Sequence, residues 1–563
     1  MNAPETTPTD RRVTPSSASR RWTFAALMLV VAVGIGARCW GIDTKPVWHD
    51  EVYTRIFAAG HQSSEWIAAL YTGRPVSRDE ILAFQRLDPD RDAVDTARGL
   101  ARDEPQHPPA YYVLARLWMG AFGDDIGALR ALSVVLSLLA LWAAAWLGRE
   151  LFGPRGPPAA EAVVAERARS LLIALLAASP FVVLYAQEAR EYSLWSVWIL
   201  AGTAALLRAL RVSTAAATRA ARVRAWATYA VVTALGLYTS FSHVAVIAAH
   251  VLYVALRTRG RVTREGLSAA LALLGSAALF TPWAVLLAEH MEAFQASMAW
   301  SRTIIVPRGE VLATLASNVS RPILDLWPVI AGSVAWGAVA LTCAGVVAAL
   351  ARLGRRGPRQ TRALVILLVV VPIGVLVVPD LAVGGVRSFS TRYLFPALLA
   401  VLVAVAWALA SVPRRGVRRA LVALVLGVMV ASAVRTTGDA VPWTRALSAG
   451  VPHVAAAVNA SAQPLVVGDR ERHHPGNLLA LATMVGPDAT FVLLDHPDRA
   501  SVIDQALAEA EAGGGAWPPG SLPAGHTVFV YAPIPQLREA LEGATGRPAT
   551  LVWRDLYVSC WRL

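Results

Sequence analysis

Two adjacent carboxylates, Asp50 and Glu51, follow the first long apolar run of the chain, which extends from Trp22 to Trp40. That run has about the length needed to cross the hydrocarbon core of a bilayer. Four arginines precede it, a bias that favours a cytoplasmic N-terminus, so we expect the two carboxylates to emerge at the outer interface. A carboxylate there can accept a proton from an attacking hydroxyl group. Taken alone, the pair also fits an ordinary solvated helix end.

Other polar clusters lie at the ends of later apolar runs, and the alternation of the runs places them on the same membrane face. These clusters contain Gln106 and His107, Gln187 to Arg190, His243, and Arg387 and Arg392. An arginine guanidinium can hold a phosphate group through two parallel hydrogen bonds. Carboxylates, histidines and arginines gathered at one interface therefore predict a site that acts on a charged, lipid-linked substrate.

The composition indicates a polytopic membrane protein. The chain has 563 residues, of which 55% are hydrophobic and 16% charged, and its mean hydropathy is +0.48. The net charge of +13 would favour nucleic acid as a partner of a soluble protein, but here the arginines cluster between apolar runs, as in cytoplasmic loops. Three cysteines provide neither a disulfide framework nor the spacing of a metal finger. Because the arginines are explained by cytoplasmic loops, we expect no nucleic-acid partner.

Apolar runs and basic loops alternate along most of the chain, which predicts about eleven transmembrane helices. We expect a cytoplasmic tail over residues 1–21 and a transmembrane domain over residues 22–436, with outer loops at 41–125 and 289–326. Within the first outer loop, the short segment 113–122 is expected to lie at the interface as a juxtamembrane helix. The run 171–185 is expected to cross the membrane as one helix.

The character of the chain changes after about residue 436. Three short β-type runs bounded by turn residues occur at 464–467, 490–494 and 527–531, with helical stretches at 501–512 and 536–542. This alternation predicts a small α/β domain over residues 437–563. An odd number of crossings from a cytoplasmic N-terminus makes that domain extracytoplasmic, in a protein of the inner or plasma membrane.

The ordered set of motifs resembles the C-type (GT-C) integral membrane glycosyltransferases, nearest to protein O-mannosyltransferases and the lipid A aminoarabinose transferase, which are related to glycosyltransferase family 39. The matching segments are Asp50-Glu51, His107 to Tyr112, Tyr185 to Tyr192, Leu237-Tyr238-Thr239 and Thr391 to Pro396. Together they span about the first 400 residues of the chain. The C-terminal domain carries no such motif.

The resemblance implies a GT-C fold and an enzyme that transfers a hexose or a pentose from a polyprenyl-phosphate donor to an acceptor on the extracytoplasmic face. The acceptor would be a protein, a lipid or a polysaccharide of the cell envelope. Asp50 would be the general base. Glu51 would shape the site or raise the basicity of Asp50, because one of two neighbouring carboxylates has a raised pKa.

The remaining roles implied by the resemblance concern the donor and the shape of the site. The donor phosphate would be bound by Arg190, Arg392, His107 and His243. The site would be shaped by Gln106, Tyr111, Gln187, Glu188 and Tyr192. Gln106 stands where some relatives carry an acidic residue, which weakens the case for a metal. We therefore expect no assured cofactor and leave a divalent metal ion open.

Two alternatives from other classes stay open at this stage. A membrane transporter or channel would place ionisable groups near the bilayer midplane and often has repeated halves, and the sequence displays neither feature. A GT-C scaffold without catalytic activity would act through its C-terminal domain. The intact pair of Asp50 and Glu51 argues against such a scaffold.

Overall fold

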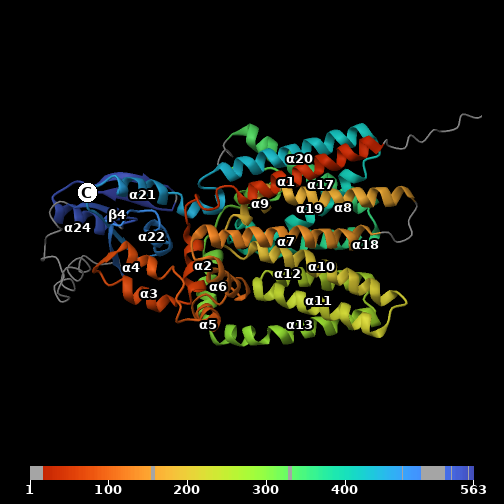
Figure 1. Cartoon of the computed structure of the whole chain (residues 1–563), viewed down its shortest axis with the longest axis horizontal. Coiled ribbons are helices and arrows are strands. Elements are labelled where there is room, and N and C mark those ends of the chain that lie inside the picture. Colours follow the sequence, from red (N-terminus) through yellow and green to blue (C-terminus); the bar gives the residue numbers. More distant parts are fainter. Residues whose placement is uncertain are drawn as a thin grey trace, which may run out of the picture.

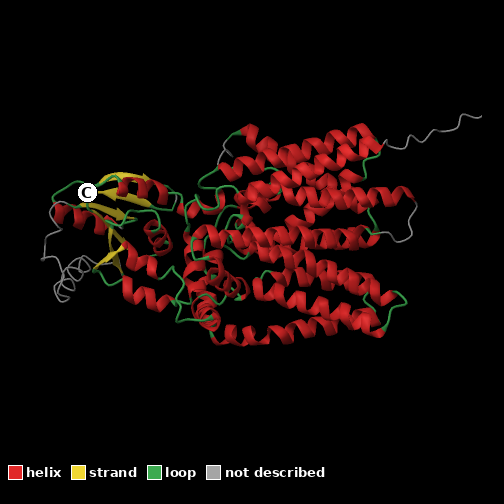
Figure 2. Ribbon diagram, viewed as in Figure 1, coloured by secondary structure: helices red, strands yellow, loops and turns green. Residues whose placement is uncertain are grey.

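The chain forms a long bundle of helices with a small α/β domain at one end (Figure 1). The computed structural model describes residues 17–153, 159–327, 332–471, 473–495, 526–533, 535–555 and 557–563. Within these residues helices dominate, and the strands belong to a single sheet (Figure 2).

Seven of the described helices are long and apolar enough to cross a membrane. They are α7 (Ile126–Phe152), α10 (Tyr192–Thr214), α13 (Arg264–Glu289), α17 (Ser333–Arg356), α18 (Arg359–Val383), α19 (Phe395–Ala410) with the preceding turn η2 (Thr391–Leu394), and α20 (Arg415–Gly438) with the following turn η3 (Trp443–Ser448). Hydrocarbon offers no partner for backbone N–H and C=O groups, so such apolar runs become helices whose backbone bonds are satisfied internally.

The pair α8 (Ala159–Ala178) and α9 (Pro180–Ala186) is long and apolar enough for a further span only when taken together, and the two helices are bent by 54° relative to each other. The sequence predicts one continuous helix over residues 171–185, and this detail is wrong. Pro180 has no backbone N–H to donate and begins a new helix. The segment after α9, residues 187–191, is completely buried, so the break delivers its polar side chains into the protein.

Three more helices, α1 (Ser17–Cys39), α11 (Arg219–Thr239) and α12 (His243–Thr258), run alongside these spans (Figure 1). With α8 and α9 counted as one, the described part of the chain contains eleven bundle helices, as the sequence predicts. The protein is therefore a multi-pass membrane protein. The arginine-rich turn between α10 and α11 lies at the end of the bundle away from the α/β domain. Which end faces the cytoplasm stays a prediction.

The two longer connections contain short helices. Between α1 and α7 lie α2 (His49–Ala59), α3 (Ser63–Leu70), α4 (Arg78–Ala83), α5 (Ala93–Asp103) and α6 (Ala110–Phe122). Between α13 and α17 lie α14 (Met291–Ser297), α15 (Trp300–Thr303) and α16 (Arg308–Ser320), and the turn η1 (Arg387–Phe389) follows α18. α6 contains the segment 113–122 that the sequence predicts as a juxtamembrane helix.

The sheet of the α/β domain has the strand order β1-β3-β2-β4-β6-β5. Its strands are β1 (Pro75–Ser77), β2 (Pro464–Asp469), β3 (Thr490–Leu494), β4 (Thr527–Tyr531), β5 (Thr550–Arg554) and β6 (Ser559–Arg562). β2 pairs in parallel with β3 and β4, and these three strands coincide with the three expected from the sequence. The accompanying helices are α21 (Val451–Asn459), α22 (His474–Ala482) and α24 (Pro535–Thr545). The helix expected at 501–512 lies outside the described residues.

One edge of this sheet comes from the first outer loop. β1 pairs antiparallel with β3, with Val76 opposite Phe491, so the sheet is not built from the C-terminal residues alone. Helix α2 packs against α22, and one apolar core contains Val52 of α2 together with Leu478 of α22. The Gln85 side chain donates to the backbone oxygen of Leu479 at 3.0 Å. Helix α2 therefore lies between the bundle and the α/β domain (Figure 1).

Candidate active site

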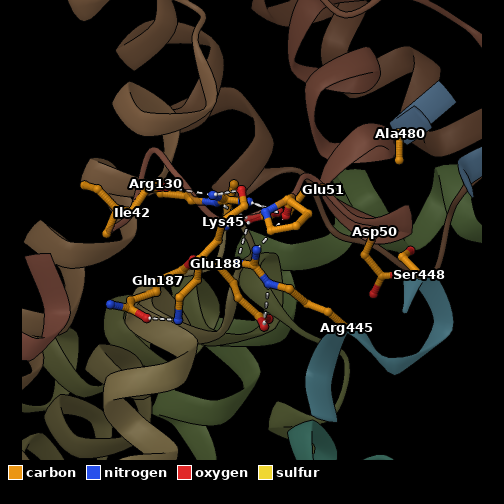
Figure 3. A network of polar contacts seen from close by, with 12 residues as sticks. Ile42, Lys45, Asp50, Glu51, Arg130, Gln187, Glu188, Arg445, Ser448 and Ala480 are labelled. Carbon is orange, nitrogen blue, oxygen red and sulfur yellow. Dashed lines mark hydrogen bonds and ion pairs between the residues drawn. The ribbon is translucent and has the colours of Figure 1, made fainter. Parts of the chain in front are cut away.

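Asp50 and Glu51 occupy the first turn of α2. The helix begins after Trp48, whose carbonyl accepts from the backbone N–H groups of Glu51 and Val52, and it ends at Gly60 in a left-handed conformation with φ of 94°. Carboxylates are favoured in a first turn because the helix dipole is positive there. Successive side chains on a helix point about 100° apart, so the two carboxylates face different surroundings (Figure 3).

The Asp50 carboxylate joins residues that are far apart in the sequence. Arg392 donates from Nη1 to Asp50 Oδ2 at 2.6 Å, and His49 Nδ1 lies 3.1 Å from Asp50 Oδ1. The guanidinium of Arg190 approaches from another side and donates to the Asp50 backbone oxygen and the Thr54 hydroxyl, each at 3.3 Å. The structure thus brings Asp50, Arg190 and Arg392 together. The Asp50 side chain keeps 15% of its surface exposed.

The surroundings of Asp50 favour its ionised form. Burial alone would raise the pKa of Asp50, but the Arg392 guanidinium and the hydrogen bond with His49 hold that pKa well below its usual range. Asp50 is therefore a carboxylate at neutral pH, bound by Arg392 and with the Arg190 guanidinium nearby at its backbone oxygen.

Glu51 faces the interior of the protein and is completely buried. Arg130 of α7 binds it through two hydrogen bonds of 2.8 and 2.6 Å, and the backbone N–H of Ala189 donates a third at 2.9 Å. Arg445 of η3 lies 3.7 Å away. Burial opposes ionisation of Glu51, but Arg130 and Arg445 lower its pKa. Since the pKa of both neighbouring carboxylates is lowered, the expected elevation of one of them is wrong: each has its own cationic partner.

The Glu51 side of α2 continues into a buried polar network, shown in Figure 3. Gln187 accepts from Lys45 Nζ at 2.7 Å and donates to the backbone oxygens of Ala37 and Trp40, which ties it to the end of α1. Glu188 lies 4.0 Å from Arg445 and beside the Thr444 side chain. Burial raises the pKa of Glu188 to about 7, although both of these neighbours lower it, and burial lowers the pKa of Lys45 to about 7.

On the Asp50 side, Arg190 belongs to a second polar group. Its Nε lies 3.2 Å from Glu191, whose other oxygen lies 3.6 Å from His107 Nδ1. Gln106 hydrogen-bonds to Glu104 and accepts from Ser297 of α14 at 2.8 Å. The carboxylate paired with His107 is therefore that of Glu191, and the Glu104 carboxylate binds Gln106; the sequence assigned neither glutamate a role, because only position 106 was considered.

His243, Tyr111 and Tyr192, which the sequence assigns to the site, each have further contacts of their own, and only His243 lies away from Asp50 and its arginines. His243 is buried and accepts from Trp195 Nε1 at 3.1 Å, with no described contact to Asp50, Arg190 or Arg392. The Tyr111 hydroxyl bonds to Ser133 at 3.0 Å. The ring of Tyr192 stacks on Phe395 at a centroid distance of 6.0 Å, and Tyr192 lies close enough to Arg392 and Arg190 to interact with them electrostatically, so it borders the site. Among the described residues, no group of three or more His, Cys, Asp or Glu is arranged to hold a metal ion.

Several residues of the site carry no motif and were missed. Arg130 is an arginine inside an apolar run, a placement that is expensive unless a partner exists, so its position is a usable signal. Arg445 gives no comparable signal, because its partner Glu51 is 394 residues away along the chain. His49 is next to its partner Asp50 in the sequence, but its residue type alone does not indicate the contact. Only the fold reveals that Arg445 and Arg130 share one carboxylate.

No protein-family model matches the chain, and no curated protein matches its sequence. Among solved structures, the chain is similar to ArnT from Cupriavidus metallidurans bound to undecaprenyl phosphate, with 14% identity, a TM-score of 0.54 and coverage of 96% of this chain and 98% of that one. Apo ArnT from the same organism gives 14% identity, a TM-score of 0.53 and coverage of 97% and 98%.

A weaker likeness is to the archaeal oligosaccharyltransferase AglB from Archaeoglobus fulgidus, solved with an inhibitory peptide and a dolichol-phosphate. It is 13% identical and has a TM-score of 0.47, with coverage of 92% of this chain and 70% of that one. At these identities only the fold is defined, and the likeness to ArnT extends over nearly the whole chain. The protein therefore has the GT-C membrane fold that the sequence predicts, with a small C-terminal sheet.

Proposed function

We propose that the protein is a membrane glycosyltransferase that transfers a sugar from a polyprenyl-phosphate donor to an acceptor. The observation that carries the proposal is the pair of arginines at Asp50: Arg392 binds its carboxylate, and Arg190 binds its backbone oxygen. The fold adds support, because the similar protein ArnT was crystallised with undecaprenyl phosphate. A base beside two guanidinium groups matches the needs of a reaction in which a hydroxyl loses a proton and a phosphate leaves.

In the proposed reaction, the acceptor oxygen attacks the anomeric carbon of the donor sugar. A bond forms between those two atoms, the bond from the anomeric carbon to the phosphate oxygen breaks, and polyprenyl phosphate leaves with the bonding electrons. Asp50 takes the acceptor proton. Arg190 and Arg392 stabilise the negative charge of the departing phosphate. His107 and Arg190 both contact the Glu191 carboxylate, so His107 lies beside the arginine.

Arg392 is suited to hold a phosphate and a carboxylate in turn. Its Nη1 binds Asp50, whereas its Nε is buried and has no hydrogen-bond partner among the described residues. Arg392 also lies in the turn before α19, where the positive end of the helix dipole favours an anion. A donor phosphate on Arg392 would weaken its hold on Asp50 and make that carboxylate a stronger base.

The side of the membrane on which this occurs is part of the proposal. The arginine-rich turns favour a cytoplasmic location for the opposite end of the bundle, which makes the Asp50 end extracytoplasmic. Sugar nucleotides are made in the cytoplasm, so a lipid carrier would have to deliver the sugar. A reporter that is active only outside the cytoplasm should give signal when fused at Asp439 and none when fused in the turn after α10. The reverse pattern would reject this orientation.

The deciding experiment supplies the purified protein in detergent with radiolabelled polyprenyl-phosphate sugars and, separately, with sugar nucleotides. We expect transfer only from the lipid-linked donors. The same assay, run with protein, lipid and polysaccharide fractions of the cell envelope, identifies the acceptor class. Transfer from the nucleotide alone would reject the proposed donor.

A further inference from the structure

We propose that His49 is a positioning residue for Asp50 and that the C-terminal α/β domain holds His49 in place. On this view, which rests on the proposed function, the α/β domain is part of the active site. Each oxygen of the Asp50 carboxylate would be held by a different part of the molecule. Arg392 fixes Oδ2 from the bundle, and His49 fixes Oδ1 from the side of the α/β domain.

The contacts of His49 reach directly into the C-terminal residues. The backbone N–H of His49 donates to the Ser448 hydroxyl at 3.0 Å, and that hydroxyl donates to Asn477 Oδ1 at 2.6 Å. Asn477 is buried on α22 and also donates to the backbone oxygen of Leu447 at 2.9 Å. A chain of hydrogen bonds thus leads from α22 through η3 to the first residue of α2.

The imidazole ring is confined as well. A Cβ atom added at Gly476 of α22 would lie 2.4 Å from His49 Cδ2, so the ring occupies space that only a glycine leaves open. On another side, the Tyr53 ring meets His49 edge-on, with centroids 5.1 Å apart. With its backbone bonded and its ring packed on two sides, His49 presents Nδ1 to Asp50 in one orientation.

Such confinement has a chemical use. A general base must lie within about 2.6–3.2 Å of the proton that it removes. A misplacement of about 1 Å can slow a reaction about 100-fold. An aspartate bound only by Arg392 could turn about its side-chain bonds when a donor phosphate engages that arginine. The bond with His49 Nδ1 would then keep Asp50 oriented toward the acceptor.

Two kinds of variant test the proposal in the full-length protein. Gly476→Ala pushes a methyl group against the His49 ring, and Gly543→Ala is the matched control, since an added Cβ there meets nothing within 4 Å. His49→Asn retains a donor near the position of Nδ1, whereas His49→Leu removes it. Asparagine is smaller than histidine and leucine is close to it in size, so these two variants remain informative if Gly476→Ala does not fold.

With polyprenyl-phosphate sugar as donor, Gly476→Ala and His49→Leu should lower kcat about 10- to 100-fold with the donor KM within about 2-fold of wild type. His49→Asn should recover most of the rate, and Gly543→Ala should match wild type. The melting temperature of each variant checks that the fold persists. A His49→Leu protein with wild-type kcat would overturn the proposal.

A second readout needs no turnover. The infrared difference between wild-type and Asp50→Asn protein isolates the carboxylate stretching band of Asp50. That band should shift in the His49→Leu and Gly476→Ala backgrounds and stay in place in Gly543→Ala. An unchanged band would reject the positioning role even in an active glycosyltransferase. A shifted band in a protein that transfers no sugar would reject the proposed function and keep the positioning role.

Discussion

Asp50 and Glu51 are adjacent in the sequence and each binds an arginine, yet they differ in exposure and in how completely their oxygens are bound. Asp50 keeps part of its surface exposed and meets Arg392 and His49 at single oxygens. Glu51 has no exposed surface, and Arg130 engages both of its oxygens. The difference indicates that Asp50 is available to a substrate, whereas Glu51 joins helices and cannot exchange its partners without disrupting the fold.

The first and largest expected effect tests the Asp50 half of this comparison. Asp50→Asn keeps the size of the side chain but removes its ability to take a proton at neutral pH. We expect kcat to fall by about 10²–10⁴-fold or more, with the melting temperature and donor binding nearly unchanged. Purified Asp50→Asn protein with near-normal turnover would move the base elsewhere, and Glu188 or Glu104 would be examined next.

The second expected effect is a loss of thermal stability when Glu51 is replaced. Glu51→Gln leaves Arg130 buried without a carboxylate and Arg445 with only Glu188 at 4.0 Å, and breaking a buried ion pair typically costs about 3–5 kcal/mol. Thermal denaturation in detergent should show a large drop in melting temperature. The matched control is Glu80→Gln, whose partner Arg74 is half exposed, because such a surface pair contributes only about 0–1 kcal/mol. Equal melting temperatures for both variants would refute a structural role for Glu51.

The sequence predicts the Asp50 region better than the Glu51 region, for a physical reason. Asp50, Arg190 and Arg392 sit at the ends of apolar runs, and the alternation of crossings places all such ends on one face. Glu51 depends on Arg130, inside a span, and on Arg445, beyond the last span. Those partners are selected by helix packing, which a hydropathy pattern does not contain.

A similar limit applies to the fold. Long apolar helices and the strands β2, β3 and β4 follow from local pattern. Strand β1 has three residues, too few for a periodic signal, and becomes a strand only because β3 offers an open edge. The environment of His49 has the same origin, since Gly476 and Asn477 reach it only after the α/β domain has packed on α2.

The third expected effect probes how Arg392 tunes Asp50. Arg392→Ala should raise the donor KM and lower kcat/KM about 10- to 100-fold, because a charge-assisted hydrogen bond contributes about 1.5–3 kcal/mol. Arg392→Lys should restore only part of that loss, since one ammonium group cannot replace a planar fork. The same change removes the main cause of the lowered Asp50 pKa. Activity of Arg392→Ala should therefore disappear at a higher pH than wild type on acidification, and an unchanged acidic limb would contradict the pairing.

The smallest expected effect lies on the Glu51 side and involves Glu188. Its pKa in the folded protein is raised to about 7 from an ordinary value of 4.5, chiefly by burial. The folded state therefore binds more protons than the unfolded state between these values, and this stabilisation is lost as the pH rises through 7. The Lys45 pKa is shifted the opposite way, to about 7 from 10.5, so Lys45 changes the stability above pH 7; comparing the variant with wild type at the same pH removes this shared contribution. Asp50 and Glu51 titrate below the window from pH 5 to 7, since the pKa of each is lowered.

Glu188→Gln keeps this side chain neutral at every pH and so isolates its contribution. Relative to wild type, the variant should have a nearly equal melting temperature at pH 5 and a melting temperature a few degrees higher at pH 7.5. At pH 7.5 wild-type Glu188 is ionised, and the cost of burying its charge exceeds what Arg445 and Thr444 return. Glu80→Gln, an exposed carboxylate, should produce no such pH-dependent difference. A Glu188→Gln protein less stable than wild type at pH 7.5 would mean that Arg445 stabilises the ionised form. Glu188 would then belong with Glu51 as a structural anion and would not be a buried acid that titrates near neutrality.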